Sequence, residues 1–206
     1  MKLLLHICCG PCLVYPVKDL RTDDVDVVGY FYNPNIHPFT EFERRVDALE
    51  QTCDALNVEV LYDETAYGLD TWLRAVGERT IQAQRCPICY RMRLEAAARK
   101  ARELGLPYYS TTLLYSRYQR HDLIRRIGEE AGESNGVRFY YKDFRTGWDE
   151  GIFIAKKLGV YRQPYCGCIY SEAERYLKRA GRLRDRFMAC NNSFKKGADK
   201  RREYIY

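Results

Sequence analysis

Seven of the nine cysteines in this chain fall into three tight groups, and this spacing constrains its fold and chemistry most. The groups are Cys8, Cys9 and Cys12; Cys86 and Cys89; and Cys166 and Cys168, whereas Cys53 and Cys190 stand alone. An odd number of cysteines without a secretory signal argues against a disulfide framework. The grouped cysteines are therefore predicted to bind metal, and the two single ones are interpreted as small buried hydrophobic residues.

Short apolar runs alternate with helical patterns along the chain of 206 residues. Strands are expected at residues 3–7, 25–32, 58–62, 107–112 and 137–141. Helices are expected at residues 11–20, 40–56 with Thr40 as N-cap, 69–76, 90–104, 122–133, 149–158 and 171–180. This alternation predicts an α/β fold with a doubly wound, mainly parallel sheet and helices on both faces. We expect a single α/β domain over residues 1–180 and a basic C-terminal extension over 181–206.

The first cysteine group directly follows the first expected strand. In doubly wound sheets the ligand lies beyond the carboxyl ends of the strands, at a switch point in the strand order, so this group is predicted to lie at the functional site. Because neighbouring residues of a strand point to opposite sides, Cys8 and Cys9 are expected to diverge. His6, within an apolar strand pattern, is interpreted as a core histidine rather than a ligand.

The number of grouped thiols exceeds what one metal centre needs. A [4Fe–4S] cluster and a structural zinc ion each take four thiolates, which leaves three of the seven. The surplus suggests a second metal with an open position for substrate, and a zinc site using four thiols is the alternative. Arg85, Arg91 and Arg93 flank the Cys86–Cys89 pair and are expected to offset its negative charge.

Positive charge gathers near the C-terminus of a chain whose net charge is +6. Residues 178–202 contain ten basic residues against two aspartates. Such a segment could follow a phosphate backbone, although a solvent-exposed helix and tail would explain it equally well. No apolar run reaches the length of a membrane span and no signal peptide is visible, so a cytoplasmic protein without membrane contact is expected.

Five linked motifs resemble the cobalamin-independent epoxyqueuosine reductase family of the QueH type. They lie at residues 6–12, 32–36, 85–93, 110–114 and 161–168, and the match runs in order to about Leu177. The resemblance implies a fold like that of the adenine nucleotide α-hydrolases. It also implies reduction of epoxyqueuosine to queuosine at the tRNA wobble position, with a [4Fe–4S] cluster, an adjacent mononuclear iron and an external electron donor.

The resemblance also implies a division of the thiols between the two centres. Cys86, Cys89 and one member of each other pair would hold the cluster, and the remaining members would hold the iron together with Cys12. We assign Cys9 and Cys168 to the cluster and Cys8 and Cys166 to the iron. The family can carry an aspartate at the position of Cys12, and a thiolate there would make the iron a softer, weaker Lewis acid.

Motif position supplies candidates for the remaining roles. The candidate proton donors are Tyr32, Tyr161 and Tyr165, each of which could equally be a packing residue. The candidate substrate contacts are Asn33, Asn35, Arg85, Arg162 and Gln163, with Asp143 or Asp149 as a partner for the substrate amine. The target base would be splayed out of the anticodon loop of the tRNA.

Two other classes of protein remain open on the sequence. A zinc-stabilised nucleic-acid-binding module without catalysis would use four cysteines and the basic segment. A tRNA-thiolating enzyme on the same kind of sheet would need a Gly/Ser-rich ATP loop after the first strand, where cysteines stand instead.

Overall fold

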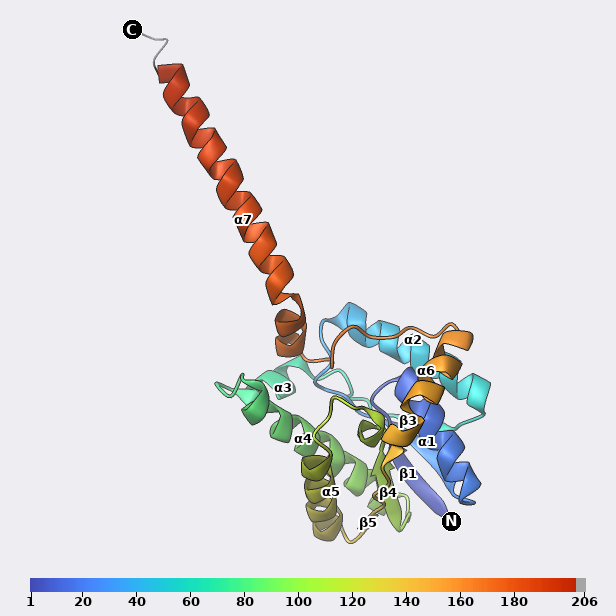
Figure 1. The fold of residues 1–206 in the computed structure, drawn as a ribbon. Coiled ribbons are helices and arrows are strands. Elements are labelled where there is room, and N and C mark those ends of the chain that lie inside the picture. The colour runs from blue at the N-terminus through green and yellow to red at the C-terminus, as the bar shows by residue number, and fades with distance from the viewer. Residues whose placement is uncertain (203–206) are drawn as a thin grey trace.

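A five-stranded parallel sheet forms the centre of the molecule, in the order β3-β2-β1-β4-β5 (Figure 1). The structure, a computed structural model, describes residues 1–202, with side chains described to residue 191. The strands are β1 (Lys2–His6), β2 (Asp26–Phe31), β3 (Val60–Tyr62), β4 (Tyr108–Thr111) and β5 (Arg138–Phe139). The predicted doubly wound α/β fold is confirmed, and its switch point lies between β1 and β4.

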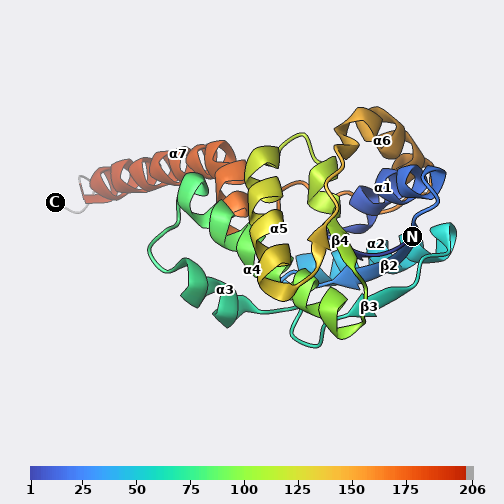
Figure 2. The same ribbon diagram turned by 90° about the horizontal axis from the view of Figure 1, so that it is seen from below.

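Two layers of helices cover the sheet (Figures 1 and 2). The helices are α1 (Gly10–Thr22), α2 (Phe39–Leu56), α3 (Leu69–Val76), α4 (Gln82–Glu103), α5 (His121–Asn135), α6 (Trp148–Lys157) and α7 (Ile169–Arg202), with short 3-10 turns η1 (Thr112–Tyr115) and η2 (Phe144–Gly147). α1 packs against α2 and α6, whereas α4 packs against α5. The chain crosses from β1 to β2 in one direction and from β3 back past β1 to β4 in the other. Because each crossover is right-handed, the helices α1, α2 and α6 and the helices α4 and α5 lie on opposite faces of the sheet.

The central strand explains why the first cysteine group is fixed in place. Leu3, Leu4 and Leu5 are completely buried because β1 has a neighbouring strand on each side and helices on both faces. The chain leaves this buried strand at His6 and enters α1 at Gly10, with Pro11 in the first turn as expected. The loop between them is therefore held at both ends.

The start of α2 differs from the prediction, because the helix begins at Phe39 and its N-cap is Pro38 rather than Thr40. The backbone N–H groups of Glu41 and Phe42 already donate to the carbonyl oxygen of Pro38. Thr40 is exposed in the first turn, and Glu41 turns inward to the buried Arg45. The capping pattern is present in the sequence, but the helix starts before it.

The helix expected from Tyr90 begins eight residues earlier, so Cys86 and Cys89 lie on α4 itself. Proline usually ends a helix, which is why the prediction started the helix after Pro87. Here Pro87 lies in the second turn, where its missing N–H removes one helical hydrogen bond. The helical spacing of three residues brings both thiols to the same face of α4.

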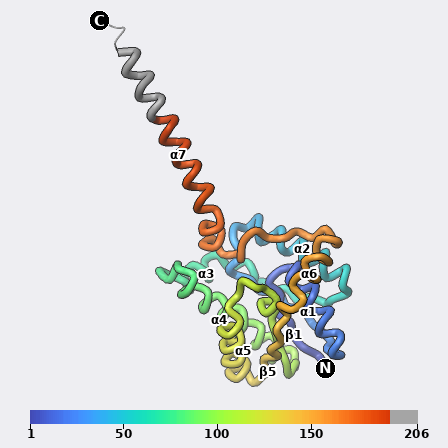
Figure 3. Tube along the Cα trace, viewed as in Figure 1, coloured from blue at the N-terminus to red at the C-terminus, as the bar shows by residue number. Residues whose placement is uncertain are grey.

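The last helix is also longer than predicted: α7 begins at Ile169 and continues to Arg202 instead of ending near residue 180. The helix continues through Gly181. α7 projects away from the body of the molecule (Figures 1 and 3). The side chains of Lys195, Lys196 and Lys200, and those of Arg201 and Arg202, lie outside the described residues. Within the described part of the chain, no helix is long and apolar enough to cross a membrane.

Candidate metal centre

The first cysteine group forms a compact set of sulfur atoms at the end of β1. The three Sγ atoms of Cys8, Cys9 and Cys12 all lie within 4.8 Å of one another. The Sγ atoms of Cys8 and Cys9 are 3.8 Å apart, and those of Cys9 and Cys12 are 2.6 Å apart. Thiolate ligands of metal centres come in such close sets, so this loop is suited to metal binding.

The expectation that Cys8 and Cys9 diverge is wrong. It assumed that the strand continues through both residues, but β1 ends at His6 and the chain bends at Cys8. The alternation of side chains therefore no longer applies. Hydrogen bonds from Cys12 and Cys9 hold the pKa of Cys8 well below its usual value, although burial opposes them.

The neighbouring strand β4 fixes the same loop from the other side of the switch point. The backbone N–H of Cys8 donates to Oγ1 of Thr112 over 3.0 Å, and that hydroxyl lies 3.3 Å from the Cys8 sulfur. His6 is completely buried between Thr111 Oγ1, at 2.9 Å, and the carbonyl oxygen of Tyr32, at 3.1 Å. Burial lowers the pKa of His6 to about 4, so it is a neutral core histidine as predicted.

The other two groups meet beside α4. Cys168 is buried with Cys89, whereas Cys166 is exposed. Burial raises the pKa of Cys89 to about 12; Arg93 opposes this shift, and the charges of Cys166 and Cys168 add to it. Burial likewise raises the pKa of Cys86 to about 11, with a contribution from Cys166. These four thiols are therefore close enough to influence one another electrostatically.

Of the described residues, Cys8, Cys9 and Cys12 form the set close enough to hold one metal ion, and Cys166 lines the cavity that Cys8 and Cys12 also line. All nine cysteines lie within the described residues, and all are free thiols. Soft thiolate donors of this kind suit iron–sulfur clusters, iron and zinc. The donor set therefore fits a metal centre.

A buried ion pair holds the segment that carries Cys166. Arg45, on α2, donates from Nη1 to the carbonyl oxygen of Cys166 over 2.9 Å and from Nη2 to that of Tyr165 over 3.0 Å. Its Nε donates to the carboxylate of Glu41, one turn earlier on the same helix. Sequence analysis did not select Arg45, although a charged pair on the apolar face of α2 is a visible signal.

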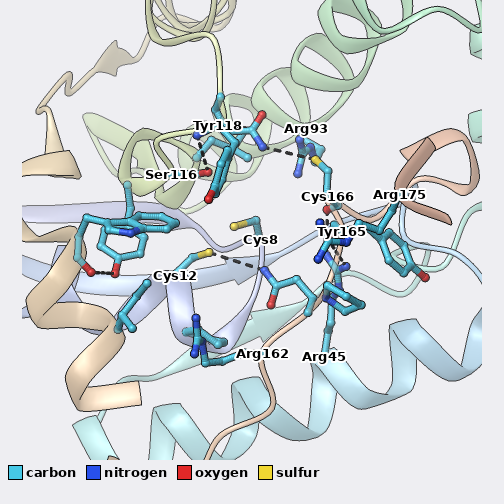
Figure 4. Close-up of a pocket in the computed structure, with 18 residues that line it drawn as sticks. Cys8, Cys12, Arg45, Arg93, Ser116, Tyr118, Arg162, Tyr165, Cys166 and Arg175 are labelled. Atoms are coloured by element: carbon cyan, nitrogen blue, oxygen red, sulfur yellow. Dashed lines mark hydrogen bonds between the residues drawn. The ribbon is translucent and has the colours of Figure 1, made fainter. Parts of the chain in front are cut away.

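An open cavity of about 590 Å³ lies in front of the thiols (Figure 4). Three cysteines line it, Cys8, Cys12 and Cys166, together with four arginines, Arg45, Arg93, Arg162 and Arg175. The remaining grouped cysteines, Cys9, Cys86, Cys89 and Cys168, are not among the lining residues. The lining includes no carboxylate among the residues that the structure describes, so the cavity suits an anionic or electron-rich ligand.

Arg93 brings a buried positive charge to the sulfur atoms. Its Nε donates to the carbonyl oxygen of Cys89 over 3.3 Å and its Nη1 to Oδ1 of Asn33 over 3.4 Å, while Nη2 has no hydrogen-bond partner among the described residues. Burial alone would lower the pKa of Arg93, but the charges of Cys89, Cys166 and Cys8 outweigh it and raise the pKa. Of the other arginines expected near the thiols, Arg85 interacts with Cys168 and Glu174, whereas Arg91 pairs with Glu130 at the surface.

An aromatic wall, made of Tyr115, Tyr118 and Trp148, forms one side of the cavity. The Tyr115 and Trp148 rings stack with their centroids 5.1 Å apart, and Tyr118 meets Trp148 edge-on at 5.7 Å. Tyr118 is 80% exposed, so its ring is available to a ligand. Sequence analysis missed this wall because Trp148 lies about thirty residues after Tyr115 and Tyr118, and only the tertiary structure brings them together.

The structure brings some of the predicted site residues to the cavity. Arg162 and Gln163 line it, and Gln163 donates from Nε2 to the Cys9 sulfur over 2.9 Å. Tyr165 also lines the cavity, with its hydroxyl donating to the carbonyl oxygen of His37 over 2.6 Å.

Other predicted residues lie elsewhere. Asn33 and Asn35 are buried, and Arg85 pairs with Glu174. The hydroxyl of Tyr161 donates to the carboxylate of Glu41. Tyr32 lines a second, smaller pocket together with Tyr30 and Asp63. Asp143 pairs with Arg145, and Asp149 with Arg117. None of these residues lines the cavity, and their proposed roles stay predictions.

The fold and the site together define a thiol-rich, doubly wound α/β protein with an open cationic cavity at its switch point. The same fold occurs in the U34-tRNA thiolase NcsA from Methanococcus maripaludis, solved with its [4Fe-4S] cluster. That structure aligns with all of this chain and 74% of its own, at a TM-score of 0.55 and 16% sequence identity. A likeness at this level of identity concerns the fold alone.

Sequence comparison then identifies the family. The family described as "Epoxyqueuosine reductase QueH" matches residues 3–174. The epoxyqueuosine reductase QueH of Thermotoga maritima is 37% identical over 183 residues, covering 86% of this chain and 93% of the relative. That of Dehalococcoides mccartyi is 38% identical over 177 residues, covering 86% and 96%. The chain belongs to the QueH epoxyqueuosine reductase family.

Family membership decides between the classes of protein that the sequence left open. The chain is an oxidoreductase of queuosine biosynthesis, a family that acts on tRNA. This excludes the zinc-stabilised module without catalysis and the tRNA-thiolating enzyme.

Proposed function

We propose that this reductase uses a [4Fe–4S] cluster beside a mononuclear iron to deoxygenate epoxyqueuosine at the wobble position of tRNA. The observation that carries the proposal is the compact set of Cys8, Cys9 and Cys12 at a cavity that Cys166 also lines. Seven thiols exceed the four that a single cluster or zinc ion would use. Nine free cysteines also favour the reducing cytoplasm as the compartment.

The position of each thiol relative to the cavity supports a division between the two centres. Cys9, Cys86, Cys89 and Cys168 are not among the residues that line the cavity, and four thiolates are what a cluster requires. Cys8, Cys12 and Cys166 line the cavity, where a metal needs an open position for substrate. We therefore assign the first set to the cluster and the second to the iron.

The reaction removes one oxygen atom from the epoxide and forms an alkene and water, which takes two electrons and two protons. The bound metals would supply these electrons from an external donor and a Lewis acid for the epoxide oxygen. Among the predicted proton donors, Tyr165 is the one that lines the cavity. Burial raises the pKa of Tyr165, so its hydroxyl keeps its proton at neutral pH until the substrate accepts it.

The chain's own residues can hold the substrate base in this cavity. A wobble base splayed from the anticodon loop would stack on the aromatic wall, as unstacked bases commonly do on aromatic side chains. Arg162 and Gln163, adjacent in sequence and both at the lining, would contact its polar edge. The arginines of the lining would attract the neighbouring phosphates.

Anaerobic reconstitution tests the cofactors independently of turnover. We expect about five iron atoms per chain, four in the cluster and one beside it, with visible absorbance that dithionite bleaches. C166A should lose about one iron and keep the absorbance, whereas C89A should lose the absorbance. About four iron atoms in the wild type, with epoxyqueuosine-containing tRNA still reduced, would overturn the second centre.

A further inference from the structure

α7 carries a row of arginines that starts at the cavity. Arg175, Arg179, Arg182 and Arg186 follow one another at spacings of four, three and four residues, so they share one face of the helix. The row covers about 16 Å at the helical rise per residue. Arg175 lines the cavity and is labelled in Figure 4, which places one end of the row at the site. The family match ends at residue 174, so the row lies beyond it.

The arginines of this row are free to bind a ligand. All four are exposed, and within the described part of the chain no carboxylate forms an ion pair with any of them. Arg184 lies on the opposite side of α7 by helical spacing. Unlike the four arginines of the row, it has an ion-pair partner, because its Nε lies 3.8 Å from Oδ1 of Asp185. Uncompensated guanidinium groups at regular spacing favour a polyanion.

The first turns of α7 fix the row relative to the cavity. Glu174 accepts two hydrogen bonds from the buried Arg85 of α4, at 2.8 and 2.5 Å. Tyr170 packs against the buried cluster that contains Cys89 and Cys168. The helix is therefore anchored beside the thiols. It carries the arginine row as it projects away from the body of the molecule (Figure 1).

We propose that the arginine row of α7 binds the sugar–phosphate backbone of the anticodon arm of tRNA and so directs the wobble base into the cavity. This inference rests on the proposed function, and it specifies where the RNA leaves the site. RNA is the favoured occupant because its charge is opposite to that of the row. A second copy of this chain paired along α7 would bring like charges together.

The test uses two full-length variants with the same net charge. The row variant is R179Q/R182Q/R186Q, which leaves the cavity residue Arg175 in place. The control is R126Q/R138Q/R184Q, which removes three exposed arginines that lie neither on the row nor in the lining. Glutamine and arginine have similar helix propensities, so α7 should persist, and circular dichroism checks this.

Binding of an anticodon stem–loop RNA with guanosine at the wobble position is measured over a series of salt concentrations. Each lost phosphate contact lowers the slope of log K against log salt by about 0.9, so the row variant should lose about two to three units of slope. Its affinity at low salt should fall at least tenfold, while the control stays within about twofold of the wild type.

Separate outcomes distinguish this inference from the proposed function. Failure of the wild type to reduce epoxyqueuosine-containing tRNA would count against the function itself. If the wild type reduces that tRNA and the row variant keeps the wild-type salt slope, the arginine row is not the RNA-binding surface. A row variant that changes only the oligomeric state, measured by light scattering, would also overturn the inference.

Discussion

Arg45 and Cys166 are joined by a hydrogen bond of 2.9 Å from the guanidinium to the backbone carbonyl oxygen. This bond connects a buried position of α2 to the segment that carries two of the grouped thiols, although the residues are far apart in sequence. Arg45 is 2% exposed, and it also pairs with Glu41. The stability of the fold and the shape of the thiol site therefore depend on the same side chain.

Replacing Arg45 with methionine should destabilise the protein strongly. Breaking one partner of a buried ion pair costs about 3–5 kcal/mol, because the other charge is left buried. Urea unfolding under reducing conditions measures this loss, and iron uptake should fall with it. In the double variant E41L/R45M, no buried charge remains, so part of the lost stability should return. A loss below about 1 kcal/mol for R45M would contradict the structural role.

The buried charge of Arg93 should set the reduction potential of the reconstituted centre. The guanidinium lies near Cys89, Cys166 and Cys8 and stabilises negative charge there, so its removal disfavours the reduced state. We expect R93Q to shift the potential negatively by about 60 mV or more, the one-electron equivalent of a tenfold change in equilibrium. R93K should shift it less, and R91Q, at an exposed ion pair, should not shift it. A potential unchanged in R93Q, measured by spectroelectrochemical titration, would exclude this role.

The aromatic wall should contribute to substrate binding rather than to the chemical step. Stacking on an aromatic side chain is worth about 1–3 kcal/mol per base, so W148A should raise KM by about tenfold or more. We expect kcat to change little and W148F to recover most of the affinity. The matched control for W148A is F153A, because Phe153 is 68% exposed on the same helix and is absent from the lining. Equal effects of W148A and F153A would remove the wall from the binding site.

Stability should fall as the pH decreases from about 6.5 to about 4. Burial lowers the pKa of His37 to about 4, below its value of 6.5 in the unfolded chain, so unfolding takes up a proton in this interval. One such group contributes a slope of up to about 1.4 kcal/mol per pH unit, and the stability it provides is complete above pH 6.5. Urea unfolding of the metal-free reduced protein at several pH values measures the slope. H37Q should reduce it; an unchanged slope would mean that His37 is accessible to protons in the folded state.

The sequence predicted the place of the first thiol group better than it predicted the bounds of the helices. Cysteine spacing indicated that Cys8, Cys9 and Cys12 lie together, because metal ligands must lie close to one another whatever the local structure. The predicted helix at residues 90–104 missed the first turns of α4, which contain Pro87, and the predicted helix at residues 171–180 missed most of α7, which continues through Gly181. Arg45 could not be connected to Cys166 from the sequence, since only the tertiary structure brings them together.

The last prediction concerns Cys12, the third thiol of the first cysteine group. Its sulfur lies 2.6 Å from that of Cys9 and faces the cavity, at a position of α1 where a carboxylate could also reach a metal (Figure 4). C12D should therefore retain the additional iron, held by a harder oxygen ligand, and keep turnover within about tenfold of the wild type. C12A should lose that iron and most of the turnover, whereas C190S, at an exposed cysteine remote from the cavity lining, should lose neither. Iron analysis and anaerobic turnover measure both effects, and equal iron contents in C12A and the wild type would show that Cys12 is not a ligand.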